Sequence, residues 1–481
     1  MKAIKPLILF LLVMMVAYGC KLRKPFEGTE MPMPSAFRFD AQQQPQDSVV
    51  NIGWWELFDD PQLDTLIATG LGNSYDVRIA VKRLEQAQKT VKIQNAEFLP
   101  KFSANGTATR GNSVSGLRFD QLGLGSVNNN FSITGNASWE LDFWGKYQSL
   151  SEAAKAQYLA SEYTLRNIQL QLVSNIAQNY FLLLQEKARL EIATATLNSR
   201  DSSLNILRQR FDRGLIPEID VNQAEIQRAI AATSVPVFKR SVARQENLLS
   251  VLLGQAPGEI QVGKLLADQK AQMEIPTGLP SDLLQRRPDI LATEQQVIAQ
   301  HALVGAANAN RLPSISLTGL IGGASNELTS LTAGGPLWSV GGGFTAPLFQ
   351  WGQLKNQADI ERLKRDESVL NYEATVLGAF REVEDALITI STLKEEIQAR
   401  QDNVVAAANA EYLSRERYDK GMTSYLEYLE QQRQYFNARL EYAQTAQQLL
   451  SSYVELYKVL GGGWMSQEEQ QAAEQAAQQE N

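Results

Sequence analysis

A long stretch without glycine or proline sets the tightest limit on how this chain can fold. Neither residue occurs after Gly145 until past Phe211. An α-helix rises about 1.5 Å per residue, so this stretch predicts roughly 100 Å of continuous helix. Large apolar side chains recur along it every seven residues, at Ile176, Leu183, Leu190, Leu197, Leu204 and Phe211. A sustained seven-residue period keeps one stripe facing a neighbouring helix, which predicts a left-handed coiled coil.

The same unit occurs twice along the chain. The run RFDRG at 210–214 recurs as RYDKG at 417–421, 207 residues later. Two further pairs match at that offset, namely Trp144-Gly145 with Trp351-Gly352 and Leu253-Gly254 with Leu460-Gly461. Matches at one fixed spacing are the signature of a repeat. We therefore interpret the mature chain as a tandem duplication of one structural unit.

Each unit is predicted to contain a helix, two strands, the long helix, a turn and a return helix. The first unit covers 20–280 and the second 281–464, and the Gln-, Glu- and Ala-rich tail at 465–481 is expected to be disordered. Pro236 interrupts the first return helix only, so a kink or break is expected there. The expected bounds are strands at 101–110 and 130–142, a long helix at 145–211 and a return helix to 253, then strands at 313–322 and 337–348, a long helix at 352–418 and a return helix to 460.

Both pairs of predicted strands alternate between apolar and polar residues. In the clearest case, apolar residues take every second position at Phe131, Ile133, Gly135, Ala137, Trp139 and Leu141. Strands of about ten residues with aromatic residues near their ends are typical of transmembrane β-barrels. Phe102, Trp139 and Trp338 are such residues here. A half-buried soluble sheet would give the same alternation, so the pattern alone leaves both readings open.

The number of predicted strands bears on assembly. Four strands per chain are too few to close a barrel, since small barrels have about eight. An open sheet edge in lipid would leave backbone N–H and C=O groups unpaired, each at a cost of several kcal/mol. The strands must therefore be pooled between chains. Either two or three chains satisfy this requirement, and only the wider barrel leaves an obvious aqueous channel.

The N-terminus has the features of a secretory signal peptide. Lys2 and Lys5 precede an apolar run at 7–16 that is too short to span a bilayer. Ala17, Tyr18 and Gly19 then lead to Cys20, the only cysteine in the chain, although a lipobox more often has leucine and a small residue where Ala17 and Tyr18 stand. A lone cysteine at this place is typical of a bacterial lipobox, so we expect a lipoprotein with residues 1–19 removed and lipid attached to Cys20. Diacylglyceryl and N-acyl chains together would anchor the protein stably to a membrane.

The composition gives no sign of catalysis or of nucleic-acid binding. The formal net charge is −8, so no basic surface for phosphates is expected. One histidine, His301, and one cysteine leave no Cys/His nucleophile pair and no His-based metal site. We therefore expect a protein that is not an enzyme and uses no cofactor or metal. His301 is interpreted as structural, and Arg286-Arg287 before Pro288-Asp289 as an ion-pair corner where a helix begins.

Several longer motifs identify a family that this chain resembles over essentially its whole mature length. They are 54–64 (WWELFDDPQLD), 284–290 (LQRRPDI), 305–307 (GAA), 312–317 (LPSISL) and 380–387 (FREVEDAL). These runs resemble the TolC-like outer-membrane efflux proteins, in particular the NodT-type efflux lipoproteins. The resemblance implies a homotrimer with a twelve-stranded barrel in the outer membrane above a long α-helical coiled-coil tunnel in the periplasm. The expected fold is therefore mainly α with a transmembrane β-barrel.

The same resemblance implies a passive duct. The duct would complete an efflux pump with a periplasmic adaptor protein and an inner-membrane efflux transporter, and would conduct small toxic or amphiphilic compounds to the exterior. A type I secretion duct is an alternative role for this architecture. A periplasmic coiled-coil scaffold with a small soluble β-domain is the alternative from another class, although it does not account for strands that have tryptophan near their ends.

The turn after each long helix is the predicted functional end of the molecule. Gly214 and Gly421 follow the last periodic residues, where a glycine in the left-handed conformation would end the helix. By resemblance to the family, these turns would contact the adaptor through the glycines and the positions after them, Leu215, Ile216, Met422 and Thr423.

The second turn is followed by residues that the resemblance places at a periplasmic gate. Glu427 and Glu430 share a helix face because they are three residues apart. Such a pair is usually a solvated surface, but threefold symmetry would turn each acid into a ring. Thr423 stands where some relatives have arginine, so no arginine-based lock is expected. The predicted gate residues are Leu426 as an apolar constriction, Glu427, Glu430, Arg433, and Asp220 as the equivalent of Glu427 in the first unit.

Overall fold

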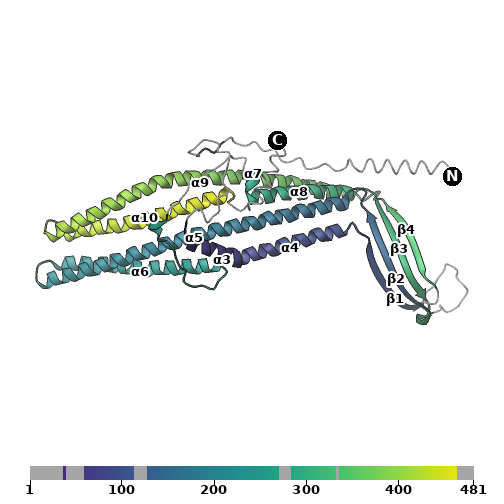
Figure 1. Ribbon diagram of the computed structural model, residues 1–481, viewed down its shortest axis with the longest axis horizontal. Helices are drawn as coiled ribbons and strands as arrows, with labels where there is room; N and C mark the ends of the chain where they lie inside the picture. The colour runs from purple at the N-terminus through teal and green to yellow at the C-terminus, as the bar shows by residue number, and fades with distance from the viewer. Residues whose placement is uncertain (1–35, 40–58, 113–126, 270–282, 332–334, 463–481) are drawn as a thin grey trace. The chain divides into compact units, whose positions relative to one another are not determined.

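The computed structural model describes residues 36–39, 59–112, 127–269, 283–331 and 335–462. The signal peptide, Cys20 and the tail at 465–481 lie outside these described residues. The elements in chain order (Figure 1) are α3 (Pro61–Asn73), α4 (Tyr75–Ala96), β1 (Lys101–Asn112), β2 (Val127–Leu141), α5 (Lys146–Asp212), α6 (Glu218–Leu252), η1 (Leu266–Asp268), α7 (Leu283–Arg286), α8 (Pro288–Ala309), β3 (Ser314–Ser325), η3 (Leu328–Ser330), β4 (Leu337–Thr345), α9 (Gln353–Asp419) and α10 (Tyr425–Val459).

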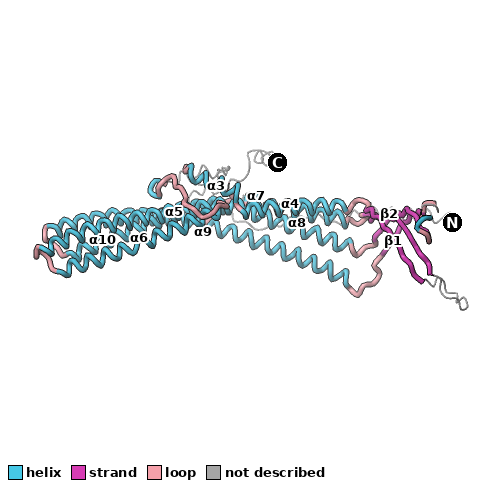
Figure 2. Tube along the Cα trace, turned by 90° about the horizontal axis from the view of Figure 1, so that it is seen from below, coloured by secondary structure: helices cyan, strands magenta, loops and turns pink. Residues whose placement is uncertain are grey.

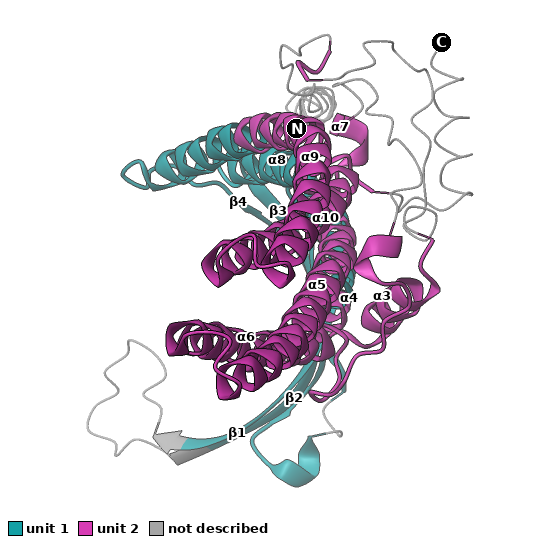
Figure 3. Ribbon diagram, turned by 90° about the vertical axis from the view of Figure 1, so that its left-hand side faces the viewer, with its two compact units in different colours: residues 1–30, 83–161, 293–372 teal, residues 31–82, 162–292, 373–481 magenta. Residues whose placement is uncertain are grey.

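The chain divides into two compact units, and each takes segments from both repeats (Figure 3). The long helices α5 and α9 are each 67 residues long and hold equivalent places in the two repeats, which confirms the tandem duplication. No described helix is both long enough and apolar enough to cross a membrane. The sheet unit comprises 1–30, 83–161 and 293–372, and the hairpin unit comprises 31–82, 162–292 and 373–481.

The sheet unit contains one antiparallel sheet in the order β1-β2-β3-β4. Its register places apolar residues of successive strands side by side, since Phe102 pairs with Ala137, Ala137 with Gly319, and Gly319 with Val340. Residues that pair across strands share a face, so the alternation in the sequence gives the sheet one apolar face. β4 ends at Thr345 rather than at the predicted 348. Pro347 explains the early end, because proline has no N–H for the ladder.

The change from strand to helix is fixed by side chains of the sheet unit. The Asp142 carboxylate accepts hydrogen bonds from the backbone N–H groups of Tyr147 (3.1 Å) and Gln148 (2.9 Å) at the start of α5. These N–H groups have no partner within the helix, so the carboxylate caps it. The Trp144 indole N–H donates to the Pro313 carbonyl at 2.5 Å and thereby links the two repeats.

The hairpin unit is built from two helical hairpins, α5 with α6 and α9 with α10 (Figures 1 and 2). The seven-residue stripe forms much of its core, because Ile176, Leu183 and Val383 are fully buried. The stripe reaches the surface at Phe211, which is 40% exposed near the end of α5.

The return helix α6 continues through Pro236, so of the kink or break expected from the sequence the break is wrong. Proline removes one N–H donor and crowds the preceding turn. The hydroxyls of Thr233 and Ser234 both donate to the Ile230 carbonyl, at 2.7 and 3.3 Å, in the turn before the proline. Both bonds go to Ile230 and neither reaches the Ala232 carbonyl, which is the acceptor left without a donor because Pro236 has no N–H.

Two polar clusters hold the shorter elements of the hairpin unit in place. Asp60 is fully buried, and its carboxylate accepts from the N–H groups of Gln62 and Leu63, from the Tyr180 hydroxyl and from the Gln269 amide. It therefore joins the start of α3 and the residue after η1 to α5.

The second cluster confirms the predicted ion-pair corner. The Arg287 guanidinium pairs with Asp289 at 2.6 Å and with Glu382 at 2.8 Å. It also donates to the Val459 carbonyl at 3.1 Å. Arg287 thus joins the start of α8 to α9 and to the end of α10.

Candidate channel aperture at the hairpin turns

The turns of both hairpins begin with the predicted glycines. Gly214 and Gly421 have positive φ, +68° and +73°. The Gly214 N–H donates to the Phe211 carbonyl and the Leu215 N–H to the Arg210 carbonyl, and equivalent bonds form at Gly421 and Met422. This is the Schellman pattern of helix ends, in which glycine avoids the strain that a Cβ would cause. No atom lies within 4 Å of the position that a Cβ would take at either glycine, so the requirement for glycine is conformational.

The residues after the glycines differ in exposure. Leu215 and Met422 are each 68% exposed and extend apolar surface into solvent. Ile216 instead packs against a buried cluster, and the Thr423 hydroxyl is hydrogen-bonded to the Glu427 carboxylate. Of the predicted adaptor contacts, Leu215 and Met422 are thus the accessible apolar ones.

A buried cluster between the two hairpins escaped the sequence analysis. It combines α5, α6 and α10, and the Tyr418 ring lies 5.2 Å from the ring of Tyr425 and 6.2 Å from that of Tyr428. The pKa of the Tyr428 hydroxyl is raised to about 12, and burial is the largest cause of this rise. No spacing in the sequence indicates this cluster, because Tyr418 lies at the end of α9 and Tyr425 begins α10 beyond the turn. Its buried members are Leu204, Leu207, Val221, Ala224, Tyr425, Tyr428 and Leu429.

The predicted gate residues of α10 lie on its surface. Leu426 is 61% exposed, next to the buried Tyr425. Glu427 pairs with Arg417 at 2.9 Å, and Glu430 pairs with Arg433 at 2.6 Å. The hydrogen bond from Arg433 lowers the pKa of the Glu430 carboxyl below its usual range. Each acid therefore has an arginine partner within the chain, which a count of acids in the sequence does not reveal.

Asp220 lies in the first turn of α6, away from the two glutamates along the chain and beside the tyrosine cluster. Burial raises the pKa of its carboxyl. Its negative charge is a secondary cause, after burial, of the raised pKa of Tyr418. Within the single chain, Asp220 thus lies beside Tyr418, and its part in a gate stays a prediction.

Two further arginines that the sequence analysis did not single out lie between the hairpins. Arg210 of α5 pairs with Asp419 of α9 at 3.1 Å, with its guanidinium 5.7 Å from the Tyr418 ring centre. Arg200 is 5% exposed and donates to the Gln227 carbonyl at 2.6 Å. Burial is the largest cause of its lowered pKa. Charged and aromatic side chains therefore link the hairpins close to the turns.

The hairpin turns and the start of α10 combine charged side chains with exposed apolar ones. Within the described ranges, no group of three or more His, Cys, Asp and Glu residues could hold a metal ion. Exposed carboxylates and arginines beside Leu426 can attract or repel ions, and an apolar ring can exclude water from a narrow passage.

Comparisons with known proteins agree with this fold over nearly the whole chain. The family model described as "Outer membrane efflux protein" matches residues 66–255 and 279–462. The toluene efflux pump outer membrane protein TtgC of Pseudomonas putida is 35% identical over 457 residues, which cover 93% of this chain and 94% of that protein.

Solved structures show the same likeness. The Campylobacter jejuni CmeC outer membrane channel superposes with a TM-score of 0.85 at 27% identity, covering 94% of this chain and 98% of that one. The open state of the Neisseria gonorrhoeae MtrE outer membrane channel gives a TM-score of 0.81 at 29% identity, covering 92% and 98%. With the family model matched in both repeats, this chain belongs to the outer membrane efflux protein family and is an efflux channel of the outer membrane.

Proposed function

We propose that three copies of this chain pool their sheets into one twelve-stranded barrel, which opens into a tunnel formed by the hairpins. The observation that supports this most strongly is the sheet itself. Its four strands form an open antiparallel sheet in which β1 and β4 are the edges. Unpaired edges are not tolerated in lipid, and closing β4 of one copy on β1 of the next removes them all.

The oligomeric state tests this assembly. Native mass spectrometry of the full-length protein released from detergent should give a single species of three chains. A stable, folded monomer or a dimer would contradict the proposed barrel.

The hairpin turns would then form the periplasmic end of the duct, with Leu426, Glu427 and Glu430 around its aperture. The exposed Leu215 and Met422 would offer apolar contacts to a periplasmic adaptor protein, and through it the duct would join an inner-membrane efflux transporter. Photo-crosslinking from position 215 or 422 in cells should capture one adaptor. Capture from Leu248, an exposed residue of α6 farther from the turn, should be much weaker.

Cargo would move passively through this duct. The relative TtgC is named for toluene efflux, which supports small toxic or amphiphilic compounds as the cargo class here. Deleting the gene should sensitise cells to such compounds only where the partner transporter is present. If the channel were a secretion duct, the deletion would instead remove an exported protein from the medium and would not change solvent or drug tolerance.

The N-terminus would add an anchor through lipid attached to Cys20. Mass spectrometry of the mature N-terminus should show Cys20 as the first residue, modified by diacylglyceryl and acyl groups, and Cys20→Ser should abolish both. An unmodified Cys20 in the mature wild-type protein would disprove the anchor.

A further inference from the structure

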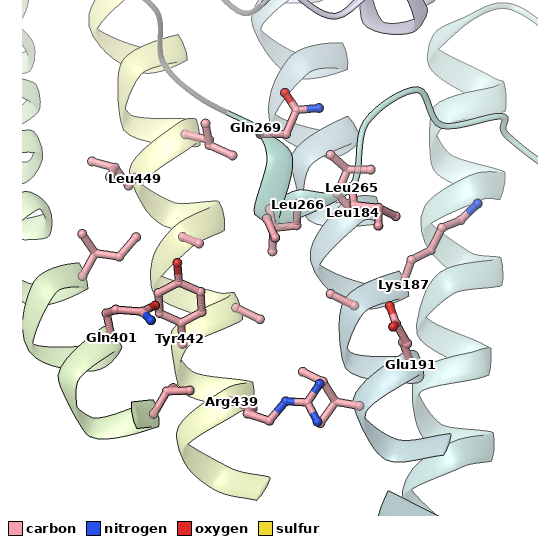
Figure 4. Close-up of a pocket in the computed structure, with 18 of the residues that line it drawn as sticks. Leu184, Lys187, Glu191, Leu265, Leu266, Gln269, Gln401, Arg439, Tyr442 and Leu449 are labelled. Atoms are coloured by element: carbon pink, nitrogen blue, oxygen red, sulfur yellow. The ribbon is translucent and has the colours of Figure 1, made fainter. Parts of the chain in front are cut away.

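The hairpin unit contains a cavity away along the chain from the turns that are proposed as the aperture. It has a volume of about 750 Å³ and lies between α5, α9, α10 and the segment around η1 (Figure 4). This volume is within the range of sites for small molecules, about 300–1,000 Å³. Its apolar lining comes from all four segments, through Leu184 and Ile192, Ile397 and Val404, Leu449 and Leu450, and Leu265 and Leu266.

One cation at this cavity forms no ion pair with any of the described residues. Arg439 lines the cavity and extends from α10 towards α5 (Figure 4). In the part of the chain that the structure describes, its guanidinium contacts only the ring of Tyr435, at 5.6 Å, and no carboxylate lies within ion-pair distance. A guanidinium has five N–H donors in a fixed fork that matches carboxylate and sulfate oxygens.

The other two charged residues that line the cavity, Lys187 and Glu191, differ from Arg439 in their surroundings. Lys187 is already neutralised by Glu246 at 3.3 Å and donates to the Ile260 carbonyl at 3.2 Å. Glu191 is exposed on α5, where solvent and salt screen its charge. The lining thus combines a long apolar surface with one available arginine.

We propose that this cavity binds an amphiphilic anion, with its hydrocarbon chain along the leucines and its carboxylate or sulfate on Arg439. The site lies within a single chain, so it does not depend on the proposed trimer. Because α5 and α10 belong to different hairpins, a bound amphiphile would contact both. It would therefore stabilise their packing, since any ligand that binds only the folded state raises its stability.

Binding can be measured on full-length protein transferred to amphipol, with protein-free amphipol as the blank. The probe is dansyl-aminoundecanoic acid, whose emission rises in an apolar site. Decanoate should displace it, and decanol, of equal chain length but uncharged, should be at least about tenfold weaker because it cannot form the charged hydrogen bonds. Equal displacement by the two would disprove the role given to Arg439.

Two variants locate the site. Arg439→Gln should weaken decanoate about tenfold and leave decanol unchanged, whereas Ala446→Phe, which fills the cavity, should abolish saturable binding of the probe. Arg365→Gln, which removes an exposed arginine of the sheet unit, is the matched control and should bind as wild type does.

Thermal unfolding gives a readout that is independent of fluorescence. Decanoate should raise the unfolding temperature of the wild type and of Arg365→Gln, but not that of Ala446→Phe. No saturable binding to the wild type, as expected if another segment of the chain already fills the cavity, would overturn the proposal. Full binding by Ala446→Phe would overturn it equally.

Discussion

At the scale of single residues, two glycines end the long helices and one buried carboxylate, that of Asp60, joins three parts of the hairpin unit. Gly214 and Gly421 were assigned as helix ends from their places after a periodic run, and both have the expected positive φ. The sequence placed Asp60 in a family motif but did not predict its contacts, because two of its donors, Tyr180 and Gln269, are 120 and 209 residues away along the chain. Nothing in the spacing of those residues predicts the contact.

Asp60→Ala should loosen α3 and the η1 segment strongly. The change leaves the Tyr180 hydroxyl and the Gln269 amide without their shared acceptor and removes the cap of α3. Each such loss is worth about 1–3 kcal/mol, so hydrogen exchange in α3 should rise at least tenfold. Asp59→Asn, which removes the charge that pairs with Lys264 at a solvent-exposed carboxylate, should have little effect. Equal exchange in the two variants would contradict this account.

Gly421→Ala and Gly378→Ala should act in opposite directions on the same helix. Alanine at Gly421 must adopt a positive φ, which costs about 1–2 kcal/mol, so the last turn of α9 should exchange its amide hydrogens faster. Gly378 is inside α9, and no atom lies within 4 Å of the position that a Cβ would take, so alanine there should stabilise the helix by roughly 0.5–1 kcal/mol. Exchange that slows in both variants would argue against a conformational role for Gly421.

At the scale of elements, the long helices were the most predictable feature and the interruptions the least. A seven-residue period without glycine or proline leaves α5 no competing structure. The repeat predicts α9 as its counterpart despite Gly378, and both helices lie within one residue of the predicted ranges. At Pro236 the local rule allowed a kink or a break, and the packing of α6 along its whole length decides against the break. Burial of Val221, Ala224, Ala231 and Leu249 holds the helix together on both sides of the proline.

Pro236→Ala should therefore strengthen α6 without changing its path. Pro236 is exposed, so little packing is lost, and alanine restores one backbone donor. Mid-helix proline costs up to about 3 kcal/mol, so the local opening free energy from hydrogen exchange should rise by roughly 1–3 kcal/mol around this position. Val237→Ala, an exposed neighbour, should change it by less than about 0.5 kcal/mol. Reduced protection in Pro236→Ala would mean that the proline shapes the helix.

At the scale of the whole molecule, the aperture at one turn stays a prediction from spacing and family resemblance, and the structure adds how the charge of its residues is balanced within one chain. Three exposed residues near one turn, Leu426, Glu427 and Glu430, were found from spacing and family resemblance. The balance depends on Arg417, which is ten residues before Glu427 and reaches it only because the turn folds α10 back on α9. Exposed pairs of this kind are worth about 0–1 kcal/mol, so an incoming cation can compete with the arginine for the acid.

This competition predicts opposite effects from the two members of one ion pair. Glu427→Gln should weaken block of single-channel current by divalent cations added on the periplasmic side, because an acid is lost from each chain. Arg417→Gln should strengthen that block up to about fivefold, because it frees Glu427 to bind the cation. Leu426→Ala should raise conductance in planar bilayers without altering the block, since it widens an apolar constriction and leaves the charges in place. If Arg417→Gln and Glu427→Gln shift the block in the same direction, or if neither shifts it, the narrowest part of the duct lies elsewhere than at these residues.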